Sequence, residues 1–213
     1  MLNNKKNIII LGIFIIAGLG TFLIAKNVKK EITNRNSGGR NIICFGDSVT
    51  FGYGVSPGED YPTALSRMTA RPVINAGADG DTSVEGLGRL KNDVLDKDPY
   101  LVLVEFSGND FIKKVPIDLT MSNIKEMVRQ IQGAGAMAAI VDVSAGFFMR
   151  EYRLRLAKLA RETGSIFIPA VLNGILTNPS MKSDFMHPNA HGYKIVAQRV
   201  NHAIRPYLKQ AQK

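Results

Sequence analysis

The chain has 213 residues, of which 45% are hydrophobic, with a formal net charge of +9 and one cysteine. Residues 1–40 hold seven Lys and Arg side chains against one Glu, so this segment carries +6 and the rest of the chain only +3. This distribution does not favour nucleic acid as a partner, because no basic stripe extends into the body of the protein. A disulfide within the chain is excluded, and Cys44, which lies in an apolar run, is expected to be a small buried hydrophobe.

Residues 8–25 form an uninterrupted apolar run, IIILGIFIIAGLGTFLIA, with lysines on both sides. As a helix, a run of this length would span about 27 Å, close to the thickness of the hydrocarbon core of a bilayer. A cleaved signal peptide usually has a shorter apolar region that ends at a small-x-small site, and FLIAKNVKK offers no convincing one. We therefore expect a single-pass transmembrane helix that anchors the protein, in preference to a cleaved signal peptide. Because positive charge lies on both sides, the orientation of this helix stays open.

The expected domain organisation is an anchor and polar linker over residues 1–40, followed by one domain over residues 41–213. Within this domain, short apolar runs alternate with longer amphipathic segments, which predicts an α/β fold with a parallel sheet covered by helices on both faces. The predicted strands are 42–45, 72–75, 101–106, 137–143 and 165–168, and the predicted helices are 61–68, 83–95, 121–133, 149–163 and 190–208. Thr82 and Glu85 have the spacing of a capping box, and Thr120 is a candidate cap for the helix over 121–133.

Unusual polar or glycine-rich segments follow the first three strands and precede the last helix. They read GDSVTFG with Ser48, NAGADGDTS with Gly80, FSGNDF with Asn109, and SDFMHPNAHGY with Asp184 and His187. Open parallel sheets bind their ligands beyond the carboxyl ends of the strands. We therefore expect these five residues to meet at one edge of the sheet.

These residue types together can perform acyl transfer. A serine hydroxyl such as that of Ser48 becomes a nucleophile when a neutral imidazole, here His187, removes its proton. Asp184 lies three residues before His187, close enough to accept the other imidazole N–H and fix the tautomer. The backbone N–H groups of Ser48 and Gly80 and the amide of Asn109 could donate hydrogen bonds to the oxyanion of the tetrahedral intermediate.

The four segments resemble the sequence blocks of the SGNH, or GDSL, hydrolase superfamily. NAGADGDTSVEGLGRL and PYLVLVEFSGND are similar to the bacterial periplasmic acyl-CoA thioesterase, lysophospholipase and arylesterase group, and the resemblance extends over residues 42–207. It implies a three-layer, flavodoxin-like fold with a central five-stranded parallel sheet, and catalysis without a metal or organic cofactor. It also implies that Ser48 is the nucleophile, that Asp184 and His187 complete the triad, and that Gly80 and Asn109 are oxyanion donors.

Two positions depart from the family pattern. GDSV replaces GDSL, which should leave the serine turn intact, and the loop VSAGFFMREY lacks the proline and asparagine that the resemblance leads us to expect. Phe147, Phe148 and Met149 in this loop are apolar enough to line an acyl-chain groove.

Each motif alone also fits ordinary turn chemistry. A metal site is a poor alternative, because the other histidines, His191 and His202, have no carboxylate partner at ligand spacing. We expect His191 to be a surface or capping residue and His202 to be a solvated residue of the last helix. Asp47, Asp79, Asp81 and Asp110 are expected to make structural hydrogen bonds.

Together the motifs predict a membrane-anchored serine esterase that cleaves acyl esters or thioesters, lysophospholipids among them, through an acyl-serine. The sequence leaves open whether the acyl acceptor is water or another alcohol. The catalytic domain is expected on the extracytoplasmic, periplasmic side, as in the similar group. The alternatives are a carbohydrate O-deacetylase of the same superfamily and a catalytically silent, membrane-tethered binding module.

Overall fold

Five parallel strands form the single sheet of the described part of the chain, as expected from the sequence. The computed structural model describes residues 31–144, 146 and 148–208. The strands are β1 (Asn41–Gly46), β2 (Val73–Gly77), β3 (Pro99–Glu105), β4 (Met137–Val141) and β5 (Ile166–Ile168). Their order, β2-β1-β3-β4-β5, is that of doubly wound, flavodoxin-like sheets. One row across the sheet runs through Asn75, Cys44, Leu103, Ala139 and Ile166.

The apolar segment 8–25, expected to span a membrane, lies outside the described residues. Among residues that the structure does describe, no helix has the length and apolar character needed to cross a bilayer. A compact unit begins at Ile32, earlier than the predicted start at residue 41. Residues just after this start are bonded to the unit, since the Thr33 N–H donates to the Gly164 carbonyl at 2.9 Å and Asn34 Nδ2 donates to the Gln132 carbonyl at 2.7 Å.

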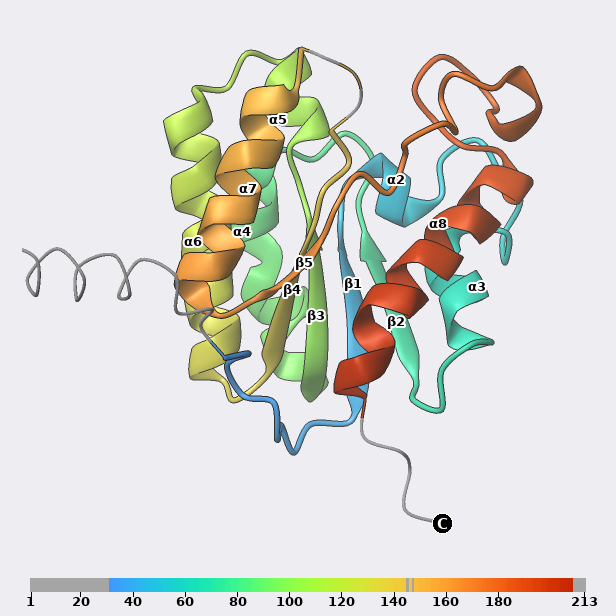
Figure 1. Ribbon diagram of the computed structural model, residues 1–213. Coiled ribbons are helices and arrows are strands. Elements are labelled where there is room, and N and C mark those ends of the chain that lie inside the picture. The colour runs from blue at the N-terminus through green and yellow to red at the C-terminus, as the bar shows by residue number, and fades with distance from the viewer. Residues whose placement is uncertain (1–30, 145, 147, 209–213) are drawn as a thin grey trace, which may run out of the picture. The chain divides into compact units, whose positions relative to one another are not determined.

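Helices cover both faces of the sheet, which gives three layers (Figure 1). On one face, α3 (Tyr61–Ser66) and α8 (Ala190–Ile204) pack on a core that includes Ile42, Cys44 and Leu103. On the other face, α4 (Ser83–Asp93), α6 (Ile117–Gly133) and α7 (Arg150–Thr163) pack on a core that includes Ile43, Phe45 and Val104. Successive residues of β1 thus point into opposite cores, because side chains alternate along a strand. Burial on both faces explains why the strand sequences are continuously apolar.

Two helix starts test the capping predictions. The capping box of Thr82 and Glu85 is confirmed at the start of α4. Thr120 as a cap is wrong, because α6 already begins at Ile117 after Pro116. The Thr120 hydroxyl is instead buried and donates to Asp110 Oδ1 at 2.8 Å. A threonine that satisfies a buried carboxylate has the same local sequence signal as one that caps a helix, so the spacing alone could not separate the two.

Several short helices complete the described fold. They are α2 (Ser48–Phe51), α5 (Gly108–Ile112) and the 3₁₀ turns η1 (Leu95–Lys97), η2 (Pro179–Met181) and η3 (Arg205–Tyr207). The sequence does not predict α2 and α5, because four or five residues are too few to show helical periodicity. Both follow strands directly and lie at the upper edge of the sheet in Figure 1, where the carboxyl ends of the strands meet. This edge carries the candidate site.

Candidate active site

Ser48 is the first residue of α2, held by a tight turn after β1. The Asp47 carboxylate caps this helix by accepting the Val49 N–H at 3.0 Å. Gly46 directly precedes Asp47. A Cβ at position 46 would come within 2.3 Å of Thr50 Oγ1 and 2.5 Å of Glu105 Oε2. Only glycine therefore fits at position 46, and the Gly-Asp-Ser sequence follows from this turn.

His187 joins Ser48 to Asp184 across the edge of the sheet. Its Nε2 lies 3.0 Å from Ser48 Oγ, and its Nδ1 lies 2.8 Å from Asp184 Oδ2. A carboxylate beside Nδ1 holds the proton there, which leaves Nε2 as an acceptor for the serine hydroxyl. The ring of Tyr53 lies 4.5 Å from the imidazole, centroid to centroid, and the imidazole is buried. His187 thus contacts both other predicted triad residues, although 139 positions separate Ser48 from His187.

The Asp184 carboxylate is oriented by its own loop. Its Oδ1 accepts the backbone N–H groups of Met186 at 2.7 Å and His187 at 2.9 Å. Partial burial opposes ionisation, but these two N–H groups and the imidazole hold the pKa of Asp184 below its ordinary value. The carboxylate therefore stays ionised beside the imidazole, where it can stabilise an imidazolium.

Asn109 and Gly80, the predicted oxyanion donors, are held by the loops after β3 and β2. Asn109 Nδ2 donates to the Asp81 carbonyl at 2.9 Å and lies 3.4 Å from Asp47 Oδ2. Gly80 has φ of +79°, a left-handed conformation that favours glycine, and its carbonyl accepts from Lys113 Nζ at 2.7 Å. Asn109 lines the same cleft as Ser48 and His187, and Gly80 is connected to Asn109 through Asp81. Within the described part of the chain, the backbone N–H groups of Ser48 and Gly80 donate to no other group.

An apolar cleft of about 360 Å³ opens beside Ser48. Its lining, besides the polar groups already named, consists mainly of Val49, Phe111, Ile112, Val143, Met149, Leu172, Leu176, Phe185 and Met186. Of the predicted groove residues, Met149 lines the cleft, and Phe147 lies outside the described residues. Phe148 does not line the cleft, and its side chain is 84% exposed. The side chains of neighbouring residues in this turn point in different directions, and that of Met149, which is buried, points toward the cleft.

The sequence does not predict the role of the other apolar residues of the cleft, although one signal could have revealed four of them. Phe185 and Met186 stand between Asp184 and His187, and both are exposed to solvent. Two consecutive large apolar residues inside a polar loop are unusual unless they contact a ligand or partner. Phe111 and Ile112 follow Asn109 in the same way.

A second carboxyl group, that of Glu105, is buried beneath the serine turn. Glu105 Oε2 accepts from Thr50 Oγ1 at 2.8 Å and from the Asp47 N–H at 3.3 Å, and Thr50 in turn contacts the Tyr61 hydroxyl at 3.2 Å. Burial, and then the nearby Asp47 carboxylate, raises the pKa of Glu105 well above its usual range, while burial raises the pKa of Asp47 to about 6. Burial disfavours the charged form of an acid, so the neutral form of Glu105 is favoured beneath the turn. The only sequence signal was a glutamate at the end of the apolar run YLVLVEF.

Arg89 of α4 also supports the site from below. Its guanidinium donates to the carbonyls of Gly46 at 2.9 Å and Ala76 at 2.8 Å and to Asp81 Oδ2 at 2.6 Å, and it lies 4.5 Å above the Phe45 ring. These bonds join the segment before Ser48 to the segment around Gly80.

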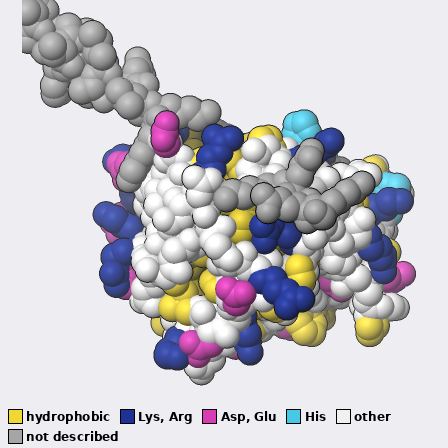
Figure 2. Space-filling model, turned by 90° about the horizontal axis from the view of Figure 1, so that it is seen from below, with side chains coloured by type: hydrophobic (Ala, Val, Ile, Leu, Met, Phe, Trp, Pro, Cys, Tyr) yellow, Lys and Arg dark blue, Asp and Glu magenta, His cyan; other side chains and the backbone are white. Residues whose placement is uncertain are grey.

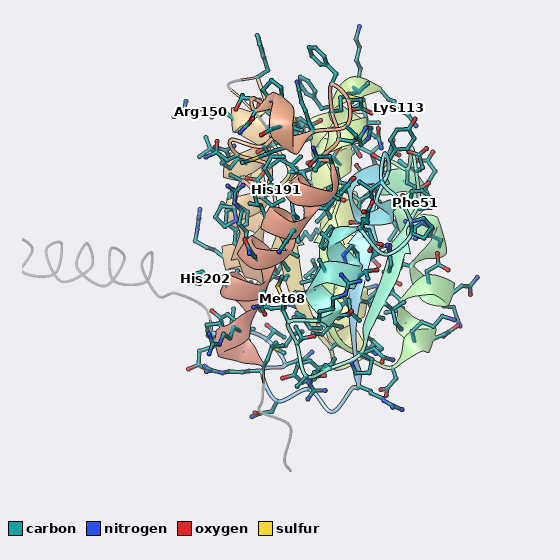
Figure 3. The ribbon with its side chains drawn as sticks, turned by 90° about the vertical axis from the view of Figure 1, so that its right-hand side faces the viewer. Phe51, Met68, Lys113, Arg150, His191 and His202 are labelled. Atoms are coloured by element: carbon teal, nitrogen blue, oxygen red, sulfur yellow. The ribbon has the colours of Figure 1, made fainter. Side chains whose placement is uncertain are left out.

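The remaining predictions near the site concern structural residues. Asp47, Asp81 and Asp110 make structural hydrogen bonds as expected, and Asp110 accepts from Ser83 Oγ at 2.6 Å. Asp79 is exposed and makes no hydrogen bond to other described groups. His191 and His202 are exposed, as predicted, and Figure 3 shows both along α8. No group of three or more His, Cys, Asp or Glu side chains within the described residues is arranged to hold a metal ion.

Comparison with known proteins assigns the family. Residues 44–195 match the model of the GDSL-like Lipase/Acylhydrolase family. Thioesterase 1/protease 1/lysophospholipase L1 of Escherichia coli K12 is 26% identical over 83% of this chain and 89% of that protein, and an arylesterase of Vibrio mimicus is 26% identical over 78% and 89%. The crystal structure of esterase EstA from Pseudoalteromonas sp. superposes with a TM-score of 0.71 at 21% identity, covering 79% of this chain and 98% of EstA. The chain therefore belongs to the GDSL-like lipase/acylhydrolase family and is a serine hydrolase that acts on ester bonds.

Proposed function

We propose that this protein is a membrane-anchored esterase that hydrolyses acyl esters or thioesters through an acyl-enzyme on Ser48. The observation that carries the proposal is the pair of contacts made by His187, 3.0 Å from Ser48 Oγ on one side and 2.8 Å from Asp184 Oδ2 on the other. Nucleophile, base and orienting carboxylate stand in the order that acyl transfer requires.

The first half-reaction forms the acyl-serine. Ser48 Oγ attacks the carbonyl carbon of the substrate while its proton moves to His187 Nε2, and Asp184 stabilises the resulting imidazolium. Collapse of the tetrahedral intermediate breaks the bond to the leaving alcohol or thiol, which takes the proton from Nε2. In the second half-reaction, water loses a proton to Nε2, attacks the acyl carbon and releases the carboxylic acid, and Ser48 regains its proton.

The oxyanion of both intermediates would lie near Asn109. The Asn109 amide has two N–H bonds, of which one is used by the Asp81 carbonyl and the other makes only a long contact to Asp47. This second N–H, with the backbone N–H groups of Ser48 and Gly80, would stabilise the developing charge. Each such donor typically lowers the barrier by about 3–4 kcal/mol.

The apolar cleft beside Ser48 supports acyl groups longer than acetyl as substrates. Its walls include Val143, Leu172 and Leu176 and offer few polar groups, so an alkyl chain would gain free energy by leaving water. The names of the related proteins refer to thioesters, lysophospholipids and aryl esters. A carbohydrate O-deacetylase, the alternative, would leave this cleft unused. Comparing kcat/KM for p-nitrophenyl acetate and octanoate distinguishes the two, and we expect the octanoate to be preferred.

Ser48→Ala tests the proposed chemistry. Loss of the nucleophile should lower kcat for a p-nitrophenyl ester by about 10⁴-fold or more, with an unchanged circular dichroism spectrum. Ser66→Ala is a matched control, because Ser66 is exposed on α3 and its hydroxyl bonds only to the Thr63 carbonyl. Turnover by Ser48→Ala within tenfold of the wild type would refute the assignment.

The apolar segment 8–25 supports the proposed single-pass anchor, with residues 1–40 as anchor and linker and the catalytic domain on the extracytoplasmic side. Proteinase K added to spheroplasts of the expressing cells tests this topology. The catalytic domain should be degraded without lysis. Protection until the cells are lysed would place the domain inside.

A further inference from the structure

Large exposed hydrophobic side chains gather at the end of the molecule that carries the site. In the described part of the chain they are Phe51, Tyr53, Val84, Phe111, Ile112, Leu119, Phe148, Leu154, Phe185 and Met186. Each lies in a loop that follows the carboxyl end of a strand, in the loop before α8, or in the first two turns of a helix that begins at this end. At the opposite end, charged side chains of both signs are interspersed with small hydrophobic areas (Figure 2).

Five of these side chains lie in the loops and short helix that border the apolar cleft, and we call them the apolar rim: Phe111, Ile112, Phe148, Phe185 and Met186. Four of the five line the cleft that contains Ser48, and Phe148 is adjacent in sequence to Met149, which also lines it. Phe185 is 89% exposed and Phe148 is 84% exposed. A cluster of large apolar groups around a cleft is unfavourable in water and marks a surface that contacts an apolar partner.

Basic side chains accompany the rim. Lys113 and Lys114 directly follow Ile112, Arg150 directly follows Met149, and Lys182 Nζ lies 5.3 Å from the centroid of the Phe185 ring. The first three are exposed, and Figure 3 shows Lys113 and Arg150 at the same end of the molecule.

Acidic groups also lie at this end, and three of them are paired. Asp184 is paired with His187, and Asp118 and Glu151 are both paired with Arg155, whereas Asp79 and Glu85 are exposed carboxylates. Within the described residues Lys114, Arg150 and Lys182 form no ion pair, so the apolar centre has unpaired cations at its margin.

We propose that the apolar rim and its four basic neighbours dock on an anionic lipid surface, from which an acyl chain enters the cleft. The binding surface is inferred from the exposed side chains and the charges described above. Only the entry of substrate into the cleft depends on the proposed function. Aromatic and aliphatic side chains insert into the boundary between headgroups and acyl chains, and nearby lysines are attracted by anionic headgroups. Because four of the rim residues line the cleft that contains Ser48, docking would bring Ser48 to the surface on which lipid esters lie.

Vesicle co-sedimentation of residues 32–213 tests the proposal. This part is a compact unit that starts after the apolar segment, and the corresponding unit accounts for almost the whole of EstA. Vesicles of phosphatidylcholine with phosphatidylglycerol should bind the protein, and vesicles of phosphatidylcholine alone should bind it at least tenfold more weakly. Phe185→Ser should weaken partitioning by about tenfold, while Phe185→Leu, which keeps an apolar side chain, should retain it.

A charge variant tests the basic margin. Lys114→Ala combined with Lys182→Ala should reduce binding to the anionic vesicles by about 25-fold, since each lysine near such a surface contributes about fivefold. The matched control is Lys91→Ala with Arg129→Ala, which removes two exposed cations that lie on α4 and α6, away from the rim. This control should bind within twofold of the wild type.

Hydrolysis of a water-soluble ester, measured on the same preparations, separates this proposal from the proposed function. An active protein that does not bind anionic vesicles, or whose binding is unaffected by Phe185→Ser, would overturn the lipid-docking proposal alone. Rim-dependent vesicle binding by a protein that hydrolyses no ester would support the docking surface and contradict the proposed chemistry.

Discussion

Arg89→Met should damage the active site although Arg89 does not line the cleft. The guanidinium donates to the Gly46 carbonyl, the Ala76 carbonyl and Asp81 Oδ2, and thereby fixes the two segments that carry Ser48 and Gly80. Methionine is long and apolar enough to keep the contact with the Phe45 ring but cannot donate. The substitution therefore removes the hydrogen bonds while it retains most of the packing.

The expected cost can be worked out bond by bond. The Arg89 and Asp81 side chains are 20% and 17% exposed, so water can replace the lost bonds only in part. A hydrogen bond to a charged group contributes about 1.5–3 kcal/mol, and the fourth bond, to the more exposed Asp93, contributes little. Since the three remaining partners rehydrate partly, we expect the free energy of unfolding to fall by about 3–5 kcal/mol.

Urea unfolding and steady-state kinetics of Arg89→Met measure the two consequences. With the Gly46 and Asp81 segments released, kcat for a short p-nitrophenyl ester should fall by at least about tenfold while KM changes little, because misplaced catalytic groups affect the transition state most. Arg129→Met is the control. Arg129 is exposed and paired with Glu126 on the same helix, so its loss should cost less than about 0.5 kcal/mol. Stability within 1 kcal/mol of the wild type and an unchanged kcat for Arg89→Met would refute the bracing role.

Three further variants test other parts of the structure. Glu105→Gln keeps an acceptor for Thr50 but cannot ionise. Because the pKa of Glu105 is raised in the folded state, the contribution of Glu105 to wild-type stability is fully present below its ordinary pKa of 4.5 and is lost as the pH rises through the folded value. The variant should therefore lose less stability than the wild type between pH 5 and 8 in urea unfolding, and parallel curves would contradict this. Asn109→Ala should lower kcat/KM for a p-nitrophenyl ester by about 10²–10³-fold, and a loss below threefold would exclude an oxyanion role. Gly86→Ala would place a Cβ 2.4 Å from the buried Phe106 ring and should cost about 1–3 kcal/mol, visible as a lower Tm; an unchanged Tm would show that the ring moves freely.

The main features of the fold are predictable from local sequence. Continuous apolar runs such as YLVLV and MAAIV predict buried parallel strands, and the Thr82–Glu85 spacing predicts the start of α4. Patterns of this kind depend on residues close together in the chain. The errors occur where a distant contact decides the local structure, as at Thr120, whose hydroxyl is bound by Asp110 rather than by a helix end.

The residues of the candidate site also differ in whether local sequence predicts them. Ser48, Asn109 and His187 stand in short motifs that follow predicted parallel strands or precede the last helix, so their meeting at one edge of the sheet can be inferred from the sequence. Arg89 and Glu105 have no such motif, and their importance depends on the carbonyls and hydroxyls that the folded chain brings to them. The position of Phe148 outside the cleft, beside Met149 inside it, depends on the path of one loop that apolar composition alone does not specify.

Labelling with a fluorophosphonate tests the role of the Ser48–His187 contact most directly. Only a serine activated by a neighbouring base reacts with this reagent. Intact-protein mass spectrometry followed by peptide mapping should find one adduct per chain, located on Ser48, and labelling should be lost in His187→Gln. An adduct on a different serine, or full labelling of Ser48→Ala, would contradict the proposed active site.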